Sequence, residues 1–549
     1  MDIEKPYRLL KTTFLIYNLI YTLPVALTTF LLAFISLFRG IGSLYALLFF
    51  ALAALSTLVV AVYPFMSVSV RNMQIVHVMP LILTHLAVLS TSTLNRKAIF
   101  DEIIERKEYG PVMEEFKSIN DLTGRLNLSF SGACRIQSRR TTSGVMSDFF
   151  GRLANSSDAG ESFSIFLKNE QQSLFQMYEI EYANAISMLD LTKELYISVI
   201  SAILFTVVMI SVIPFIQGAP VSMYVLLSII LFLMAVSALV FAVRMILPAD
   251  PLWVRNKKRL AADLKIESIF FISLPFPFFL FFALVYLLPF IPITIDLAIA
   301  LTPLFYCGFY ARREQGKVKN RDSNYPTFIR ALGSTAGVIK RLEDALDRLS
   351  AHEFGQLSTM VIRLDRRFKS RIKGSETPWQ VFGRETGSNL IYEFTHMFSS
   401  AIESGGDLAE SAMIINNNFL RMLGNRKKRY QSAAGYRWVV YGVGATVGIV
   451  FSIAFSLVFM MQDLGSNVSA FSSEHLGGMF MATMPMPYIA KDIISIIVIL
   501  AYSFAGAFII KDSEAGRNST ILTDMVGIAW VVAACWVISD MVIPALGGM

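Results

Sequence analysis

The chain has 549 residues, of which 54% are hydrophobic and only 16% are charged, and its formal net charge is +7. Because soluble domains carry about 25% charged residues, this composition excludes an ordinary soluble protein and a disordered one. The three cysteines and five histidines are scattered, and the sequence has no nucleotide-binding lysine loop or nucleophile elbow. We therefore expect no metal site, no cofactor and no enzymatic active site.

Apolar residues gather in segments long enough to cross a bilayer, whose hydrocarbon core of about 30 Å needs about 20 helical residues. The first segment is too long for a signal peptide and lacks a cleavage site of small residues, so we expect it to be retained. An alternative is that two of the segments, 268–289 and 293–310, form a re-entrant pair instead of two complete spans. The nine predicted spans are 13–37, 44–66, 196–216, 222–247, 268–289, 293–310, 437–461, 493–511 and 520–546.

Lysine and arginine predict how these spans are oriented. With a cytoplasmic N-terminus, the outer loops hold only Arg39 and Lys491 of the 48 basic residues. The opposite topology would export nearly all of the others, against the positive-inside rule. We therefore expect a multi-pass cell-membrane protein with an extracellular C-terminus. The sequon at Asn467 then lies on an outer loop, where glycosylation is possible.

Two long segments on the inner side, 67–195 and 311–436, look like copies of one unit. Apolar residues between Phe328 and Leu349 recur at helical spacing, which predicts helical bundles. Nearly constant offsets of 245 or 246 residues indicate a duplication. They align Pro80 with Pro326, Gly110 with Gly355 and Gly160 with Gly406.

The predicted fold is therefore an all-α polytopic membrane protein with two cytoplasmic helical bundles. Its expected parts are an N-terminal transmembrane pair (1–66), a first cytoplasmic domain (67–195), a central transmembrane block (196–310), a second cytoplasmic domain (311–436) and a C-terminal transmembrane block (437–549).

Charge separates the two copies. Segment 311–436 has 21 basic and 13 acidic residues, a net charge of +8, whereas 67–195 has 13 and 15, a net charge of −2. One basic run lies far from any span and is either a partner-binding surface or a solvated helix face: Arg363, Arg366, Arg367, Lys369, Arg371 and Lys373. Two runs close to spans are expected to contact lipid headgroups: Arg255, Lys257, Lys258 and Arg259, then Arg426, Lys427, Lys428 and Arg429. Aromatic residues are sparse in these runs, so we expect no nucleic-acid binding.

Two turns and three acidic residues also stand out. The pairs Gly160-Glu161 and Gly406-Asp407 each separate two apolar helices, so they serve either as helix caps or as contact loops.

Acidic residues within spans suggest an ion path, but a position near a span end favours the membrane interface. The acidic residues in question are Asp296, Asp524 and Asp540.

Several stretches resemble the type II secretion F and type IV pilus platform family. They are YPTFIRALGSTAG from Tyr325, SGGDLAESA from Ser404, and the segment from GSNLIYEFTHMF to NNNFLRMLGNRKKRYQSA. These stretches look most like the archaeal branch, which includes the platforms of the archaellum, the archaeal motility filament.

The resemblance implies a homodimeric membrane platform that couples a cytoplasmic hexameric secretion ATPase to filament subunits, either archaellins or pilins. The run from Arg363 to Lys373 and the two glycine turns would then bind partners. An adhesion-pilus or secretion platform remains an alternative, as does a solute transporter of repeated spans.

Overall fold

The computed structural model describes residues 75, 78–141, 143–217, 221–247, 250–254, 261–339, 341–370, 376–471 and 488–547. Within these residues every regular element is a helix, apart from one isolated bridge between Trp253 and Ser388. The predicted spans 13–37 and 44–66 lie outside the described residues. So do six of the basic residues singled out above: Arg255, Lys257, Lys258, Arg259, Arg371 and Lys373.

The remaining seven predicted spans all correspond to helices that are long and apolar enough to cross a membrane. The all-α polytopic fold is therefore confirmed. One of the seven spans is built from two helices, α10 and α11, in succession. The helices are α8 (Phe163–Gln217), α9 (Val221–Ile246), α10 (Ala261–Ser273), α11 (Phe276–Leu287), α12 (Ile293–Ile339), α17 (Leu408–Phe471), α19 (Tyr488–Glu514) and α20 (Ile521–Gly547).

The described chain divides into two compact units, one ending at Leu174 and the other comprising Thr91–Thr93 and the residues from Phe175 onward. The first unit has an aromatic core in which the ring centroids of Phe100 and Phe116 lie 5.0 Å apart. It is built from the helix Val78–Leu89, α4 (Arg96–Ile104), η2 (Lys107–Tyr109), α5 (Pro111–Arg125), α6 (Phe130–Arg140), α7 (Gly144–Asp158) and the beginning of α8.

His85 is fully buried in this first unit. Its Nδ1 atom lies 3.0 Å from the Tyr109 hydroxyl, and Arg106 donates to the same hydroxyl at 3.2 Å. The hydroxyl accepts from Arg106, and its own hydrogen can be donated to Nδ1 of a neutral imidazole. Burial, and secondarily the charge of Arg106, lowers the pKa of His85 well below its usual value.

We expect the protein to lose stability between pH 7.5 and pH 5.5 because of His85. In the unfolded chain its pKa is about 6.5, so the unfolded state gains a proton that the folded state does not, and folding weakens by about 1.4 kcal/mol at pH 5.5. The measurement is the thermal unfolding midpoint of the purified protein against pH. His85→Asn keeps a hydrogen-bonding group near Tyr109 without titrating, so its midpoint should fall less. Equal pH slopes for the two proteins would refute this role.

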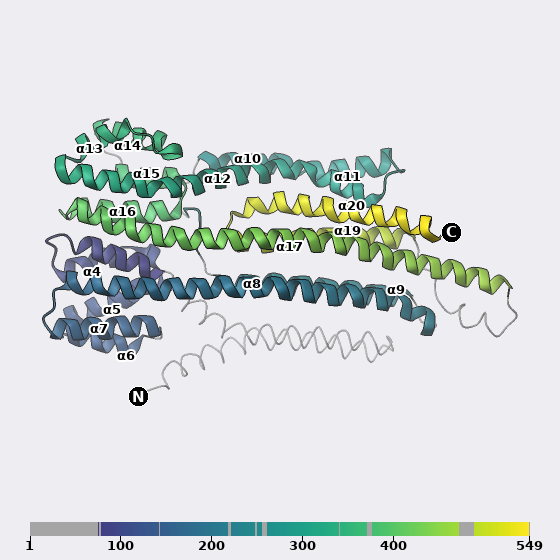
Figure 1. The fold of residues 1–549 in the computed structure, drawn as a ribbon, viewed down its shortest axis with the longest axis horizontal. Helices are drawn as coiled ribbons and strands as arrows, with labels where there is room; N and C mark the ends of the chain where they lie inside the picture. The colour runs from purple at the N-terminus through teal and green to yellow at the C-terminus, as the bar shows by residue number, and fades with distance from the viewer. Residues whose placement is uncertain are drawn as a thin grey trace. The chain divides into compact units, whose positions relative to one another are not determined.

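The second unit contains its own helical bundle and all seven of the spans described above, including the apolar part of α8. The bundle has an aromatic core in which Tyr325 and Phe419 lie 4.7 Å apart, joined by Phe328 and Phe394. Both α12 and α17 run from this bundle into a span without interruption (Figure 1). Besides these two helices, the bundle comprises α13 (Leu342–Ser350), η3 (Gly355–Leu357), α14 (Ser358–Ser370), α15 (Pro378–Thr386) and α16 (Asn389–Glu403).

The order of elements repeats between the units, as a duplication requires. The series α4, η2, α5, α6, α7, α8 has its counterpart in α13, η3, α14, α15, α16, α17. Helix α7 ends at Asp158 and α16 at Glu403, 245 residues later. Left-handed glycines also correspond: Gly110 with Gly355, and Gly160 (φ 73°) with Gly405 (φ 69°). The expected alignment of Gly160 with Gly406 is therefore wrong by one residue, since Gly405 is the residue that adopts the helix-ending conformation.

Candidate functional site

A short segment after α9 ties this span to the bundle of the second unit. In residues 250–254, here called the strap, Leu252 is buried and Trp253 forms an antiparallel bridge with Ser388. The Val254 amide donates to the Gly387 carbonyl at 3.2 Å, and the Asn389 amide donates to the Leu252 carbonyl at 3.0 Å. Gly387 accommodates this close pairing because it adopts a left-handed φ of 73° between α15 and α16.

Arg426 of α17 is buried where the strap, α12 and α8 meet. Its guanidinium donates to both carboxylate oxygens of Asp250, at 2.5 and 2.9 Å, and to the Pro251 carbonyl at 3.1 Å. Asp322 of α12 lies 3.6 Å away, and the Tyr182 hydroxyl donates to Asp250 at 3.4 Å. The side chains of Arg426 and Asp322 are only 3% and 1% exposed. A single buried cation therefore joins two carboxylates from different segments, and each charge depends on the others.

Arg429, one turn further along, binds the end of α19. It donates to the carbonyls of Asp512 and Ser513, at 2.7 and 2.9 Å, which are among the last carbonyls of that helix. The expectation that Arg426 and Arg429 contact lipid headgroups is therefore wrong, because protein groups surround both side chains. Lys427 and Lys428 point outward and are exposed, so a headgroup contact stays a prediction for them.

Two of the three acidic residues within spans, Asp524 and Asp540, have ion-pair partners that the sequence did not reveal. Asp524 lies 3.3 Å from Arg437 and 3.4 Å from Arg312. Asp540 pairs with Lys491 at 2.7 Å and accepts a hydrogen bond from Ser452 at 2.8 Å. These pairs join α12, α17, α19 and α20 to one another. Asp296 is buried near the beginning of α12.

The basic run on α14 is largely neutralised within its own bundle. Arg367 donates to both oxygens of Glu385, and Arg363 lies 3.9 Å from the same carboxylate. Lys369 bonds to Asp365 at 2.8 Å and also to Asp347. Arg366 is exposed and forms no ion pair with any residue that the structure describes. Of the four described members of the run, Arg366 therefore has its charge most available to a partner.

Both glycine turns act as helix boundaries. Asp407 caps α17, accepting hydrogen bonds from the amides of Ala409 and Glu410 at 2.9 and 3.1 Å. At the corresponding turn of the first unit, Glu161 accepts from the Ser156 hydroxyl at 2.5 Å. A Cβ atom on Gly406 would come within 2.8 Å of the Thr91 hydroxyl, so a larger residue there would have to displace the Thr91 side chain. Partner contact at these turns stays a prediction.

No described residues suggest a catalytic or metal centre. The described His, Cys, Asp and Glu side chains form no group able to hold a metal ion. Burial raises the pKa of the Cys134 thiol to about 12, which keeps it protonated and unreactive at neutral pH.

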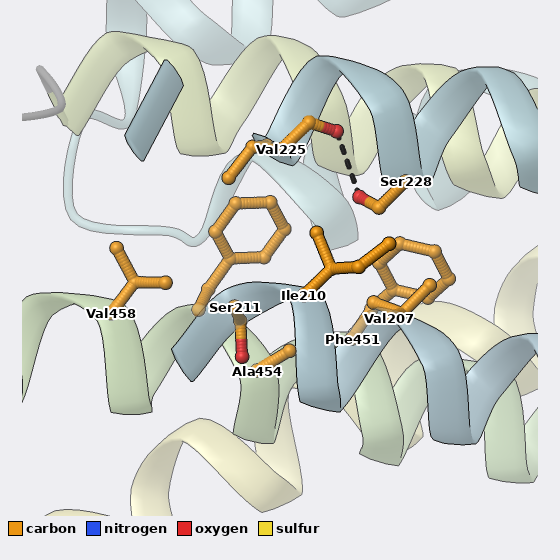
Figure 2. A pocket seen from close by; sticks show the side chains of 9 residues that line it. Val207, Ile210, Ser211, Val225, Ser228, Phe451, Ala454 and Val458 are labelled. Atoms are coloured by element: carbon orange, nitrogen blue, oxygen red, sulfur yellow. Dashed lines mark hydrogen bonds between the residues drawn. The ribbon is translucent and has the colours of Figure 1, made fainter. Parts of the chain in front are cut away.

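A small pocket among α8, α9 and α17 is apolar. Figure 2 shows Ser228 directed to the carbonyl of Val225 on its own helix, at 2.7 Å, and Ser211 likewise donates to Val208 at 2.7 Å. The two serines therefore leave no free hydroxyl donor for a polar solute, which disfavours a transport site here. The lining residues are Val207, Ile210, Ser211, Val225, Ser228, Phe451, Ala454, Phe455 and Val458.

Comparison with known proteins agrees with this arrangement. Residues 82–211 match the family model for the type II secretion system (T2SS), protein F. The flagella accessory protein J of Methanocaldococcus jannaschii is 30% identical over 97% of this chain and 96% of its own length. The chain belongs to the archaeal flagella accessory protein J family.

A second family member, from Methanococcus voltae, is 28% identical over 88% of both chains. No solved structure matches the chain significantly. The family consists of platform proteins of archaeal flagella and related pili, which are structural assembly proteins rather than enzymes. This chain is accordingly a multi-pass cell-membrane protein of that class.

Proposed function

We propose that this platform couples a cytoplasmic hexameric ATPase to the assembly of filament subunits in the membrane. The observation that carries the proposal is the continuity of α12 and α17 from the second bundle into their spans. Arg426, Asp250 and Asp322 lock these helices to the strap, so a force on the bundle would reach α9 as well. We infer an archaellum platform, with an adhesion-pilus or secretion platform as the alternative.

The orientation and assembly are part of the same proposal. The N-terminus would be cytoplasmic and the C-terminus extracellular, so that both bundles face the ATPase. Two copies would form the working platform. The distribution of lysine and arginine supports the orientation, and membership of the platform family supports the partners.

The ATPase contact would include the α14 run, in which the charge of Arg366 is the most available. We expect Arg366→Glu to weaken ATPase binding about tenfold at low salt and less at 0.5 M salt, because salt screens exposed charges. The fold should be unaffected, since exposed charges contribute little to stability. The measurement is a binding titration of the full-length protein in lipid nanodiscs against the purified ATPase.

Two matched variants sharpen this experiment. Arg330→Glu makes the same charge change at an exposed position on α12 and should leave binding nearly unchanged. Arg367→Glu would break the Glu385 pair, so a loss of binding there would combine folding with docking. Equal affinities for the wild type and Arg366→Glu would remove this face from the contact. The candidate sites of ATPase contact would then be the two glycine turns, Gly160-Glu161 and Gly406-Asp407.

A further inference from the structure

One span is far less covered by protein than the others. In the most apolar 18-residue stretch of Ala262–Leu287, the span formed by α10 and α11, only 6% of the residues are buried, against 33–61% in the corresponding stretches of the other six candidate spans. The pair makes its most extensive helix contacts with α12, and its exposed surface is apolar and rich in aromatic side chains. Phe271, Phe279 and Phe282 are 69%, 75% and 70% exposed.

This span is also interrupted within the depth of the membrane. Helix α10 ends at Ser273 and α11 begins at Phe276, with prolines at 275 and 277. The last charged residue before the break is Glu267, eight residues before Pro275. At 1.5 Å per helical residue, the break lies about 12 Å beyond that charge. A hydrocarbon core of about 30 Å therefore includes it.

The prolines leave backbone acceptors without their usual donors. In a continuous helix the carbonyls of Phe271 and Ser273 would accept from the amides of residues 275 and 277, but proline has no amide hydrogen. The nearby Ser273 hydroxyl donates to the Phe270 carbonyl, which already accepts from the Leu274 amide. Irregular backbone at this depth occurs where protein or a water-filled cavity covers it, and lipid tails supply no donors.

A second copy of the chain would fit this break poorly. Two copies related by an axis normal to the membrane place their breaks at the same depth, so that acceptors would face acceptors. The exposed Tyr286 hydroxyl lies 11 residues beyond Pro275, about 16 Å farther along α11. It cannot reach the break of a copy at the same depth. The suitable occupant is a different apolar helix that carries a hydrogen-bond donor at this level.

We propose that the exposed α10–α11 face is the docking site for the transmembrane helix of a filament subunit. This inference rests on the proposed function, which identifies the partner as a filament subunit. The carbonyls left without donors and the exposed aromatic side chains indicate that the partner segment is an apolar helix with a hydrogen-bond donor. The aromatic side chains would pack against the apolar helix, and its donor side chain would bond to the carbonyl of Phe271 or Ser273.

The test is photo-crosslinking in native membranes. A benzophenone amino acid replaces Phe279, and the control replaces Phe205, a 64% exposed residue on α8. We expect the subunit adduct at position 279 to exceed that at position 205 at least fivefold. An adduct between two copies of this chain, or no excess over position 205, would overturn the proposal.

Two further variants test the role of the free carbonyls. Leu274→Thr places a hydroxyl three residues after Phe271, where it can donate to that carbonyl as Ser211 does to Val208. Pro275→Ala returns an amide donor to the same carbonyl. Either variant, at normal protein levels, should reduce the adduct at least threefold, and an unchanged adduct in both would refute the proposal. If deleting the whole chain leaves filament assembly intact, the proposed function itself fails, whatever the crosslinks show.

Discussion

Replacing Arg426 with methionine should destabilise the protein by about 3–5 kcal/mol, since it leaves two buried carboxylates without their cation. Methionine roughly preserves the length of the side chain, so the main loss is the charge that holds Asp250 and Asp322 together. The measurement is the thermal unfolding midpoint in detergent, together with filament assembly in cells. Both should fall sharply.

The neighbouring lysine provides a matched control for this prediction. Lys427→Met removes the same charge from an exposed position in the same turn of α17, so stability should change by less than about 0.5 kcal/mol. Combining Arg426→Met with Asp250→Asn and Asp322→Asn removes all three charges and should recover part of the loss. Equal midpoints for Arg426→Met and Lys427→Met would mean that Arg426 does not hold the cluster together.

The second large effect concerns a close contact between α17 and α20. A Cβ atom on Gly448 would lie 2.4 Å from the Val532 carbonyl oxygen and 3.2 Å from the Trp536 amide nitrogen. Both are backbone atoms and cannot rotate away, so the helices would have to separate. We expect Gly448→Ala to cost about 1–3 kcal/mol and Gly448→Val to cost more.

Gly442, on the same helix, should respond in the opposite direction. A Cβ atom there meets nothing within 4 Å. Gly442→Ala should therefore stabilise α17 by up to about 1 kcal/mol through its better helix propensity. The unfolding midpoints of the two alanine variants, measured in one detergent, should lie on opposite sides of the wild type. A midpoint for Gly448→Ala at or above the wild type would show that the helices do not approach this closely.

Apolar length and helical spacing were sufficient to predict the seven described spans and the helical bundles, because both signals are local in the sequence. The sequence also contained part of the information on which basic side chains at 426–429 are buried. Arg426 and Arg429 are three residues apart and share a helix face with the buried Met422 and Ala433, whereas Lys427 and Lys428 do not. Helical phase would therefore have separated the buried arginines from the exposed lysines.

The partners of these arginines could not be predicted in the same way. Asp250 precedes Arg426 by 176 residues. No helical or strand periodicity relates a residue in the strap after α9 to a residue on α17. The α14 run shows the same limit. Its positive charge was evident from the sequence, but its neutralisation by Glu385 and Asp347 depends on how α13, α14 and α15 pack.

The uninterrupted course of α17 limits how this platform can move. Its 64 residues form a rod about 96 Å long, with no hinge between the part in the bundle and the part in the membrane. If the ATPase displaces the bundle, the end of α17 in the bilayer must tilt, slide or turn with it. The compliant component would then be the surrounding lipid, and membrane thickness and stiffness would set the resistance against which the motor works.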